Sequence, residues 1–140
     1  MEQILIAIQQ QLADNITELK YIDKDWNQLK MEQPPVKWPC VLIDIDRVDF
    51  ITVKAGPQRA EADIAVTVAN LRLVPSSSKV PNRFQSYDTI RLIGTIHRSL
   101  NGFDGNGAFR PLMRTAVHKL FGNNQAEIYA ITYRTVFVDE

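Results

Sequence analysis

Two segments with alternating apolar and polar residues decide the fold: CVLIDIDRVDFITV at residues 40–53 and AEADIAVTVANLRL at residues 60–73. In each segment about every second side chain is apolar, which is typical of a β-strand with one buried face. The alternation in the first segment slips near Arg47, which predicts a β-bulge or a strong bend there. A turn containing Gly56-Pro57 separates the two, so the sequence predicts a long β-hairpin.

Two helices and a closing pair of strands are predicted around this hairpin. Apolar residues recur every three or four positions in residues 2–19 and 85–100, the spacing of one helix face. Residues 110–121 and 126–138 are predicted strands, whereas residues 21–29 fit either an edge strand or a turn of helix. The order predicts an α+β fold: a mostly antiparallel β-sheet with a long hairpin and two main helices packed on one face.

The composition is that of one soluble globular domain, residues 1–140. The chain is 45% hydrophobic and 23% charged, which is close to the globular average. Sixteen Lys and Arg balance sixteen Asp and Glu, and this balance argues against a protein whose main partner is a nucleic-acid backbone. The apolar stretch 4–8 is too short for a signal peptide, and no segment is long enough to span a membrane.

No group of residues carries a catalytic signature. Cys40 is the only cysteine, which excludes an internal disulfide and favours a reducing compartment. It begins a hydrophobic strand, where a buried thiol is inert. His97 lies on the apolar stripe of the second helix, where a structural role is expected. We therefore predict no catalytic residues, no cofactor, no metal site and no enzymatic activity.

Two alternative functions stay open. Asp44 and Asp46 share a strand face and have Asp49 nearby, so they suit a small metal-dependent enzyme, although such carboxylates are more often the solvated side of a strand. A basic group suits a nucleic-acid-binding α+β module and comprises Arg91, Arg98, Arg110 and Arg114. The same charge split, with an acidic first strand and a basic later half, is also typical of subunits that dock against their own copies.

The order of elements resembles a known protein family. An amphipathic N-terminal helix precedes WPCVLIDI at residues 38–45, which leads into the long hairpin, and the chain ends in the strand YRTVFV at residues 133–138. A loop and the second helix lie between the long hairpin and this closing strand. The whole layout covers nearly the entire chain. It is similar to that of the tail-terminator and tail-completion (minor tail, neck) proteins of long-tailed bacteriophages and prophages.

The resemblance implies a structural virion-assembly protein. Such a protein is a homo-oligomer, usually a hexameric ring, that caps the tail tube and offers a surface to the head-tail connector. It would lie in the virion tail, and in the host cytoplasm during assembly. Its partners would be its own copies, the tail tube and the connector, with no membrane and no nucleic acid beyond DNA that passes through the ring lumen.

Residues 74–83 contain two prolines and three consecutive serines, which predicts a loop. The resemblance also places the subunit and partner contacts on the long hairpin and on this loop, here residues 51–60 and 74–83. Trp38 is added because tryptophans often anchor interfaces, and core packing is the alternative for this residue and for Trp26. The predicted interface residues are Trp38, Ile51, Val53, Lys54, Gln58, Arg59, Ser77, Lys79 and Arg83.

Overall fold

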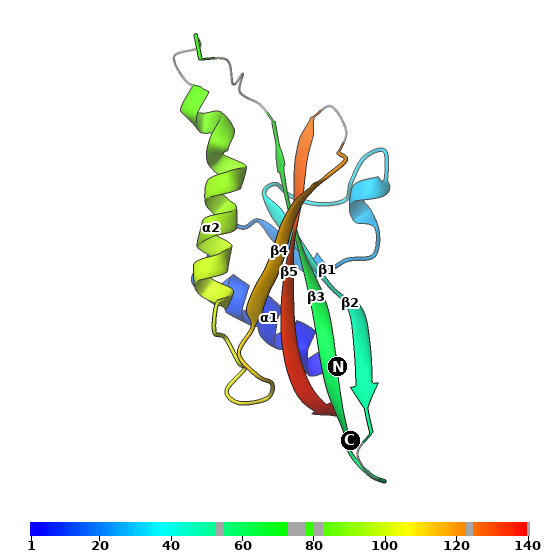
Figure 1. Cartoon of the computed structure of the whole chain (residues 1–140). Helices are drawn as coiled ribbons and strands as arrows, with labels where there is room; N and C mark the ends of the chain where they lie inside the picture. Colours follow the sequence, from blue (N-terminus) through cyan, green and yellow to red (C-terminus); the bar gives the residue numbers. More distant parts are fainter. Residues whose placement is uncertain (53–54, 73–77, 80–82, 123–124, 140) are drawn as a thin grey trace.

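The predicted α+β architecture is confirmed: a twisted five-stranded β-sheet carries two α-helices on one face (Figure 1). The structure, a computed structural model, describes residues 1–52, 55–72, 78–79, 83–122 and 125–139. Its elements, in chain order, are α1 (Glu2–Asn15), β1 (Tyr21–Lys24), the 3₁₀ helix η1 (Gln28–Lys30), β2 (Cys40–Ile51), β3 (Gln58–Leu71), the 3₁₀ helix η2 (Arg83–Tyr87), α2 (Asp88–Leu100), β4 (Met113–Leu120) and β5 (Ala126–Asp139).

The sheet has the strand order β1-β2-β3-β5-β4 and is antiparallel except at one edge. β2 with β3, β3 with β5, and β5 with β4 all pair antiparallel, which confirms the predicted mostly antiparallel sheet. The segment 21–29, which the sequence left open, begins with β1, a short strand that pairs parallel with Cys40–Ile43 of β2. The predicted second helix is shorter than residues 85–100, because the chain up to Tyr87 forms the 3₁₀ helix η2 and α2 starts at Asp88.

The predicted bulge in β2 lies where the alternation slips. Ile45 pairs with Ile64 of β3, but the next pair joins Arg47 to Asp63, so one extra residue of β2 is left between them. The extra residue returns Val48 to the face of Ile45, and both pack against the core. The bulge therefore keeps one face of a long strand apolar across a break in its sequence pattern.

The core lies between the two helices and one face of the sheet. α1 contributes Ile4, Ile8 and Leu12, and α2 contributes a matching stripe that includes Ile96 and Leu100. The sheet contributes apolar residues from its three central strands, among them Val41, Ile43, Ile64, Val66, Ile131 and Tyr133. Because each helix has a single apolar stripe, each can pack against the sheet on one side only. The two helices pack against the same face of the sheet.

The opposite face of the sheet is covered only in part. Leu29, Val36 and Trp38, from η1 and the proline-rich connector, pack over a small second cluster that contains Cys40 and Ile128. Elsewhere this face carries charged side chains that pair across strands. Arg134 of β5 lies 3.4 Å from the Glu61 carboxylate and 3.7 Å from that of Asp63 on β3.

A buried glutamine holds the turn between β1 and η1. Gln28 is fully buried, and its amide nitrogen donates to the Lys24 carbonyl at 2.9 Å and to the Asp23 carboxylate at 3.3 Å. Its amide oxygen accepts the backbone N–H of Trp26 at 2.8 Å. These bonds satisfy its polar groups, which is why a glutamine is tolerated inside the protein.

Two isoleucines on α1 provide a matched test of this packing. Ile8 is fully buried against the core, whereas Ile6 is 60% exposed on the same helix. Ile8→Ala is expected to lower the free energy of unfolding by about 2–5 kcal/mol, because it removes buried methyl groups and leaves a cavity. Ile6→Ala is expected to change it by about 0.5 kcal/mol or less. Denaturant unfolding followed by tryptophan fluorescence measures both, and similar losses would contradict the assigned helix orientation.

Candidate functional site

The edge strand β4 is exposed along its whole length. All eight of its residues are exposed, including the apolar side chains of Met113 (67% exposed), Val117 (43%) and Leu120 (36%). Phe121, the next residue, is also exposed. Within the described part of the chain, β5 is the only strand that pairs with β4. Exposure on both faces explains why residues 110–121 alternate only weakly in sequence.

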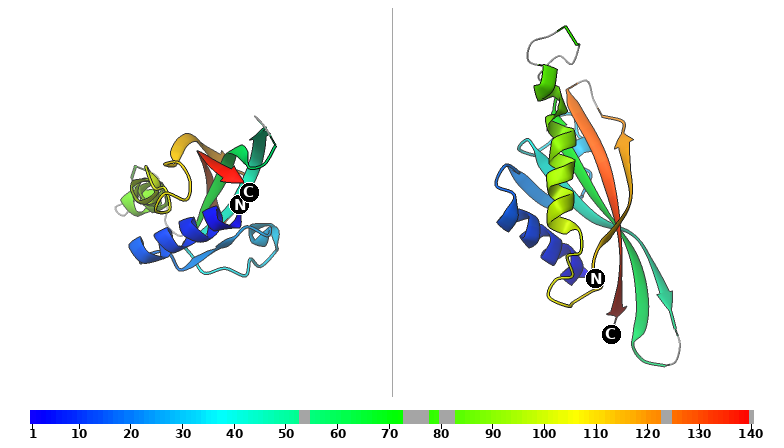
Figure 2. Two further views of the ribbon diagram at one scale, coloured as in Figure 1. Left: turned by 90° about the horizontal axis from the view of Figure 1, so that it is seen from below. Right: turned by 60° about the vertical axis from the view of Figure 1, so that its left-hand side comes forward.

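The end of the β2–β3 hairpin forms an arm that extends past both helices (Figures 1 and 2). We call residues 48–52 and 58–62 the hairpin arm. Phe50 and Ile51 on the arm are 45% and 43% exposed. Val138, which pairs with Arg59 at the end of β5, is exposed beside them. The arm therefore presents large apolar side chains to solvent, which is typical of a protein contact surface.

Three of the predicted interface residues lie together on this arm. Ile51 and Arg59 are cross-strand partners, and Gln58 begins β3 beside them. The Gln58 amide donates a hydrogen bond to the Thr52 hydroxyl, and the Arg59 guanidinium lies 4.0 Å from the Glu61 carboxylate. These three residues are available at the surface, and their part in an interface stays a prediction.

The other predicted interface residues lie apart from the arm. Trp38 is half-buried against the second cluster, while Trp26 is 51% exposed and donates its indole N–H to the Asp23 carboxylate at 3.1 Å. Lys79 is exposed, and Arg83 begins η2. Val53, Lys54 and Ser77 lie outside the described residues.

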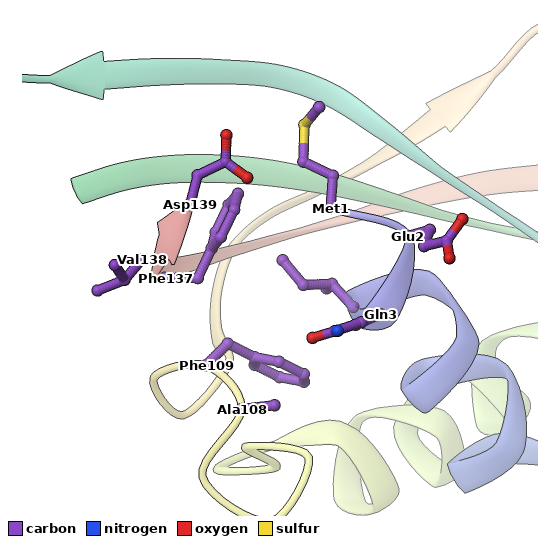
Figure 3. A pocket seen from close by; sticks show the side chains of 9 residues that line it. Met1, Glu2, Gln3, Ala108, Phe109, Phe137, Val138 and Asp139 are labelled. Carbon is purple, nitrogen blue, oxygen red and sulfur yellow. The ribbon is translucent and has the colours of Figure 1, made fainter. Parts of the chain in front are cut away.

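Two adjoining hollows lie at the base of the arm. The first, of about 390 Å³, is lined by the start of α1, residues 108–109 and the end of β5 (Figure 3). The second, of about 640 Å³, shares Phe109 and Phe137 with the first and adds Arg59 and Arg110. The described residues that line them include no His, Cys, Ser or Thr, the side chains that most often supply a nucleophile.

The acidic residues of β2 are not assembled into a metal centre. The single N–H of Arg47 Nε is shared between the two carboxylate oxygens of Asp49, at 3.1 and 3.2 Å. The Asp44 carboxylate accepts the backbone N–H of Ile45 at 2.9 Å. Over the described ranges, no three His, Cys, Asp or Glu side chains gather as metal ligands would.

The four arginines of the nucleic-acid alternative are spread over three elements. Arg91 and Arg98 lie on α2, Arg110 in the loop before β4, and Arg114 on β4. All four are exposed. Arg91 already pairs with Asp88 on its own helix, which offsets its charge.

The two candidate reactive side chains, His97 and Cys40, are both packed into the fold. The Nδ1 atom of His97 lies 3.0 Å from the Tyr133 hydroxyl, and the two rings stack with centroids 5.9 Å apart. Burial raises the pKa of Tyr133 to about 12, so its hydroxyl keeps its proton at neutral pH and hydrogen-bonds to the His97 ring as a neutral group. Burial also raises the pKa of the Cys40 thiol to about 12, which leaves it un-ionised at neutral pH.

Sequence reasoning missed the exposed apolar residues of β4. Its only signal was the weak alternation of residues 110–121, which indicates a strand without a clearly buried face. In the structure these side chains form the largest exposed stretch on a single strand among the described elements. We therefore take β4 and the hairpin arm as the candidate functional surfaces.

Comparison with known proteins adds no relative. No protein-family model matches the chain, and no curated protein matches it significantly. None of the helices in the described ranges combines the length and apolar character that crossing a membrane requires. The resemblance to tail-terminator proteins therefore depends on the order of elements alone.

The environment of His97 predicts a pH dependence of stability. Burial and, secondarily, the positive charge of Arg114 lower the pKa of His97 below its ordinary value of 6.5. Because the unfolded chain binds this proton more readily, the contribution of His97 is complete above about pH 6.5 and is lost as the pH falls toward the folded-state pKa. Between about pH 7.5 and 5.5 the wild-type free energy of unfolding should therefore fall more steeply than that of His97→Gln.

Denaturant titrations at several pH values measure these slopes. His118 provides the control, because it is exposed on β4 and has no part in the helix–sheet contact. His118→Gln is expected to keep the wild-type slope. Equal slopes for wild type and His97→Gln would contradict the assigned role of the His97–Tyr133 contact.

Proposed function

We propose that this protein is a structural subunit of a phage or prophage tail, a terminator or completion protein whose copies form a ring that joins the tail tube to the head connector. The layout of elements supports the family, since the confirmed order of helix, long hairpin, helix and closing strands is the one that carries the resemblance. The subunit functions by binding proteins, with its own copies and the tail tube as partners.

The observation that carries the proposal is the exposure of β4. Soluble monomers blunt their strand edges by shortening, bulging or covering them, because an open edge pairs with other chains. β4 is eight residues long, with one register shift near its start, between Arg114 and Ala116, and apolar side chains along its length. Such an edge is explained if assembly covers it.

The hairpin arm supports the second half of the proposal, contact with another component of the tail. Phe50 and Ile51 lie on the hairpin arm, which extends past both helices (Figure 2), and both side chains are exposed there. Apolar side chains on a projecting hairpin can enter a recess on a partner without rearrangement of the body of the subunit. We assign the arm to contact with the tail tube or with a neighbouring subunit.

The arm provides a test of partner binding. The protein is co-expressed with tail-tube protein of a long-tailed phage, and complexes are measured by sedimentation and negative-stain electron microscopy. The wild-type chain is expected to form rings at tube ends, and Ile51→Asp is expected to weaken this binding about tenfold or more because it places a charge in an apolar contact.

Ile6→Asp is the matched control for Ile51→Asp, since Ile6 is an exposed isoleucine on α1, away from the arm. It is expected to bind as wild type does. A wild-type chain that never associates with tube protein, at any ratio of the two, would refute the proposed function. Equal effects of the two substitutions would remove the arm from the interface.

A further inference from the structure

Besides the outer side of the four-residue strand β1, the described sheet has two open stretches of edge, and these are of equal length. β4, Met113–Leu120, is one. The other is the second half of β2, because β1 pairs only with Cys40–Ile43 and leaves Asp44–Ile51 with β3 as its one partner strand among the described residues. In the right-hand view of Figure 2, β4 in orange and this half of β2 in teal both lie at the margins of the sheet.

The two edges carry opposite charge. β4 contains Arg114, His118 and Lys119 and no carboxylate. The open half of β2 contains three aspartates, of which Asp49 is paired with Arg47, so that Asp44 and Asp46 remain without an ion pair in the described structure. Strands with opposite charges pair favourably across a sheet, and like charges opposite one another are destabilising.

The directions of the strands also suit a joint between these edges. Three successive antiparallel pairings separate β2 from β4, so the two strands run in opposite directions within one subunit. A neighbour rotated about an axis along the strands keeps these directions, and its β2 meets β4 in antiparallel pairing. This pairing is the commoner one between neighbouring strands.

The joint requires an offset along the strands. When the residue pairings are followed from β4 across β5 and β3 to β2, the residues of β4 align with Cys40–Arg47 of β2 in the same subunit. Pairing with Asp44–Ile51 of a neighbour therefore shifts that neighbour by four residues, roughly 13 Å. Stagger of this kind is normal where tilted strands close a sheet into a ring or barrel.

From these observations we infer that β4 of one copy pairs with Asp44–Ile51 of the next copy, so that neighbouring sheets join head to tail into one continuous sheet. The contact is heterologous, since it uses two different edges, and a heterologous contact closes into a ring when its rotation allows. The inference rests on the proposed self-assembly and names the surface through which it occurs.

Pairing of β4 with a second β4 is disfavoured by the same charges. An isologous contact would bring Arg114 and Lys119 of one copy close to the same residues of the other, with no carboxylate on either strand. The acidic half of β2 likewise opposes pairing with itself. Only the mixed contact joins a basic edge to an acidic one.

The test reverses the charge of one edge at a time. One variant carries Asp44→Lys and Asp46→Lys and has two basic edges, and the other carries Arg114→Glu and Lys119→Glu and has two acidic edges. Sedimentation of the full chain at low ionic strength, over a wide concentration range, measures self-association. Wild type is expected to associate, and each variant is expected to associate at least about tenfold more weakly, because like charges then face each other.

The decisive experiment mixes the two variants. In the mixture every joint can again pair a basic edge with an acidic one, so assembly is expected to return in complexes that contain equal amounts of both chains. Far-UV circular dichroism and the thermal midpoint verify that both variants are folded. As a control, Lys20→Glu and Lys30→Glu change the charge of exposed residues outside both edges and are expected to leave association unchanged.

The outcomes separate this inference from the proposed function. Wild-type association that both variants retain, or a mixture that fails to assemble from folded chains, overturns the edge-to-edge joint. A wild-type chain that stays monomeric at all concentrations overturns it too, while ring formation on added tail-tube protein would still support the proposed function. Association with the expected charge dependence but no binding to the tube supports the joint and refutes the tail assignment.

Discussion

The packing of β3 between two long neighbours is the constraint on which the rest of the structure depends. β3 pairs with β2 on one side and with β5 on the other along Gln58–Leu71. Its alternate residues Ala60, Ala62, Ile64, Val66 and Val68 are fully buried in the core cluster. β3 therefore provides backbone hydrogen bonds to both neighbouring strands and apolar side chains to the core. Because of this double role, the positions of α1, α2 and the outer strands depend on β3.

The same arrangement explains why the functional surfaces lie at the margins. The two helices cover only part of one sheet face, and the connector from η1 to β2 covers part of the other. The sheet is longer than this covering, so the hairpin arm at one end and β4 at one edge remain open. An open edge exposes a solitary domain to non-specific pairing with other chains. A specific partner that covers the edge removes this risk.

The charge balance of the chain acquires meaning only when it is placed on the sheet. Sixteen basic and sixteen acidic residues exclude little by themselves. In the fold, Arg134 draws Glu61 and Asp63 into cross-strand pairs on the solvent face, and Arg47 pairs with Asp49. Asp44 and Asp46, which have no ion pair among the described residues, and the basic residues of β4 therefore lie at opposite edges of the sheet. Neither the composition nor the order of residues along the chain reveals this placement.

The sequence by itself determined the local elements. Alternation predicted the strands of the long hairpin and the bulge near Arg47, because such patterns record which face of an element is buried. Three-to-four spacing predicted both helices but not their bounds, since α1 ends at Asn15 rather than near residue 19 and α2 begins at Asp88 rather than at residue 85. These patterns also predicted packed positions for Cys40 and His97, and the structure shows Cys40 buried and His97 in contact with Tyr133.

Only the tertiary structure decided the parallel pairing of β1, the burial of Gln28 and the openness of β4. Each depends on which segments, distant along the chain, lie beside a strand or leave it bare. A residue pattern indicates how many faces of an element are buried, but it does not indicate which other segment of the chain packs against those faces.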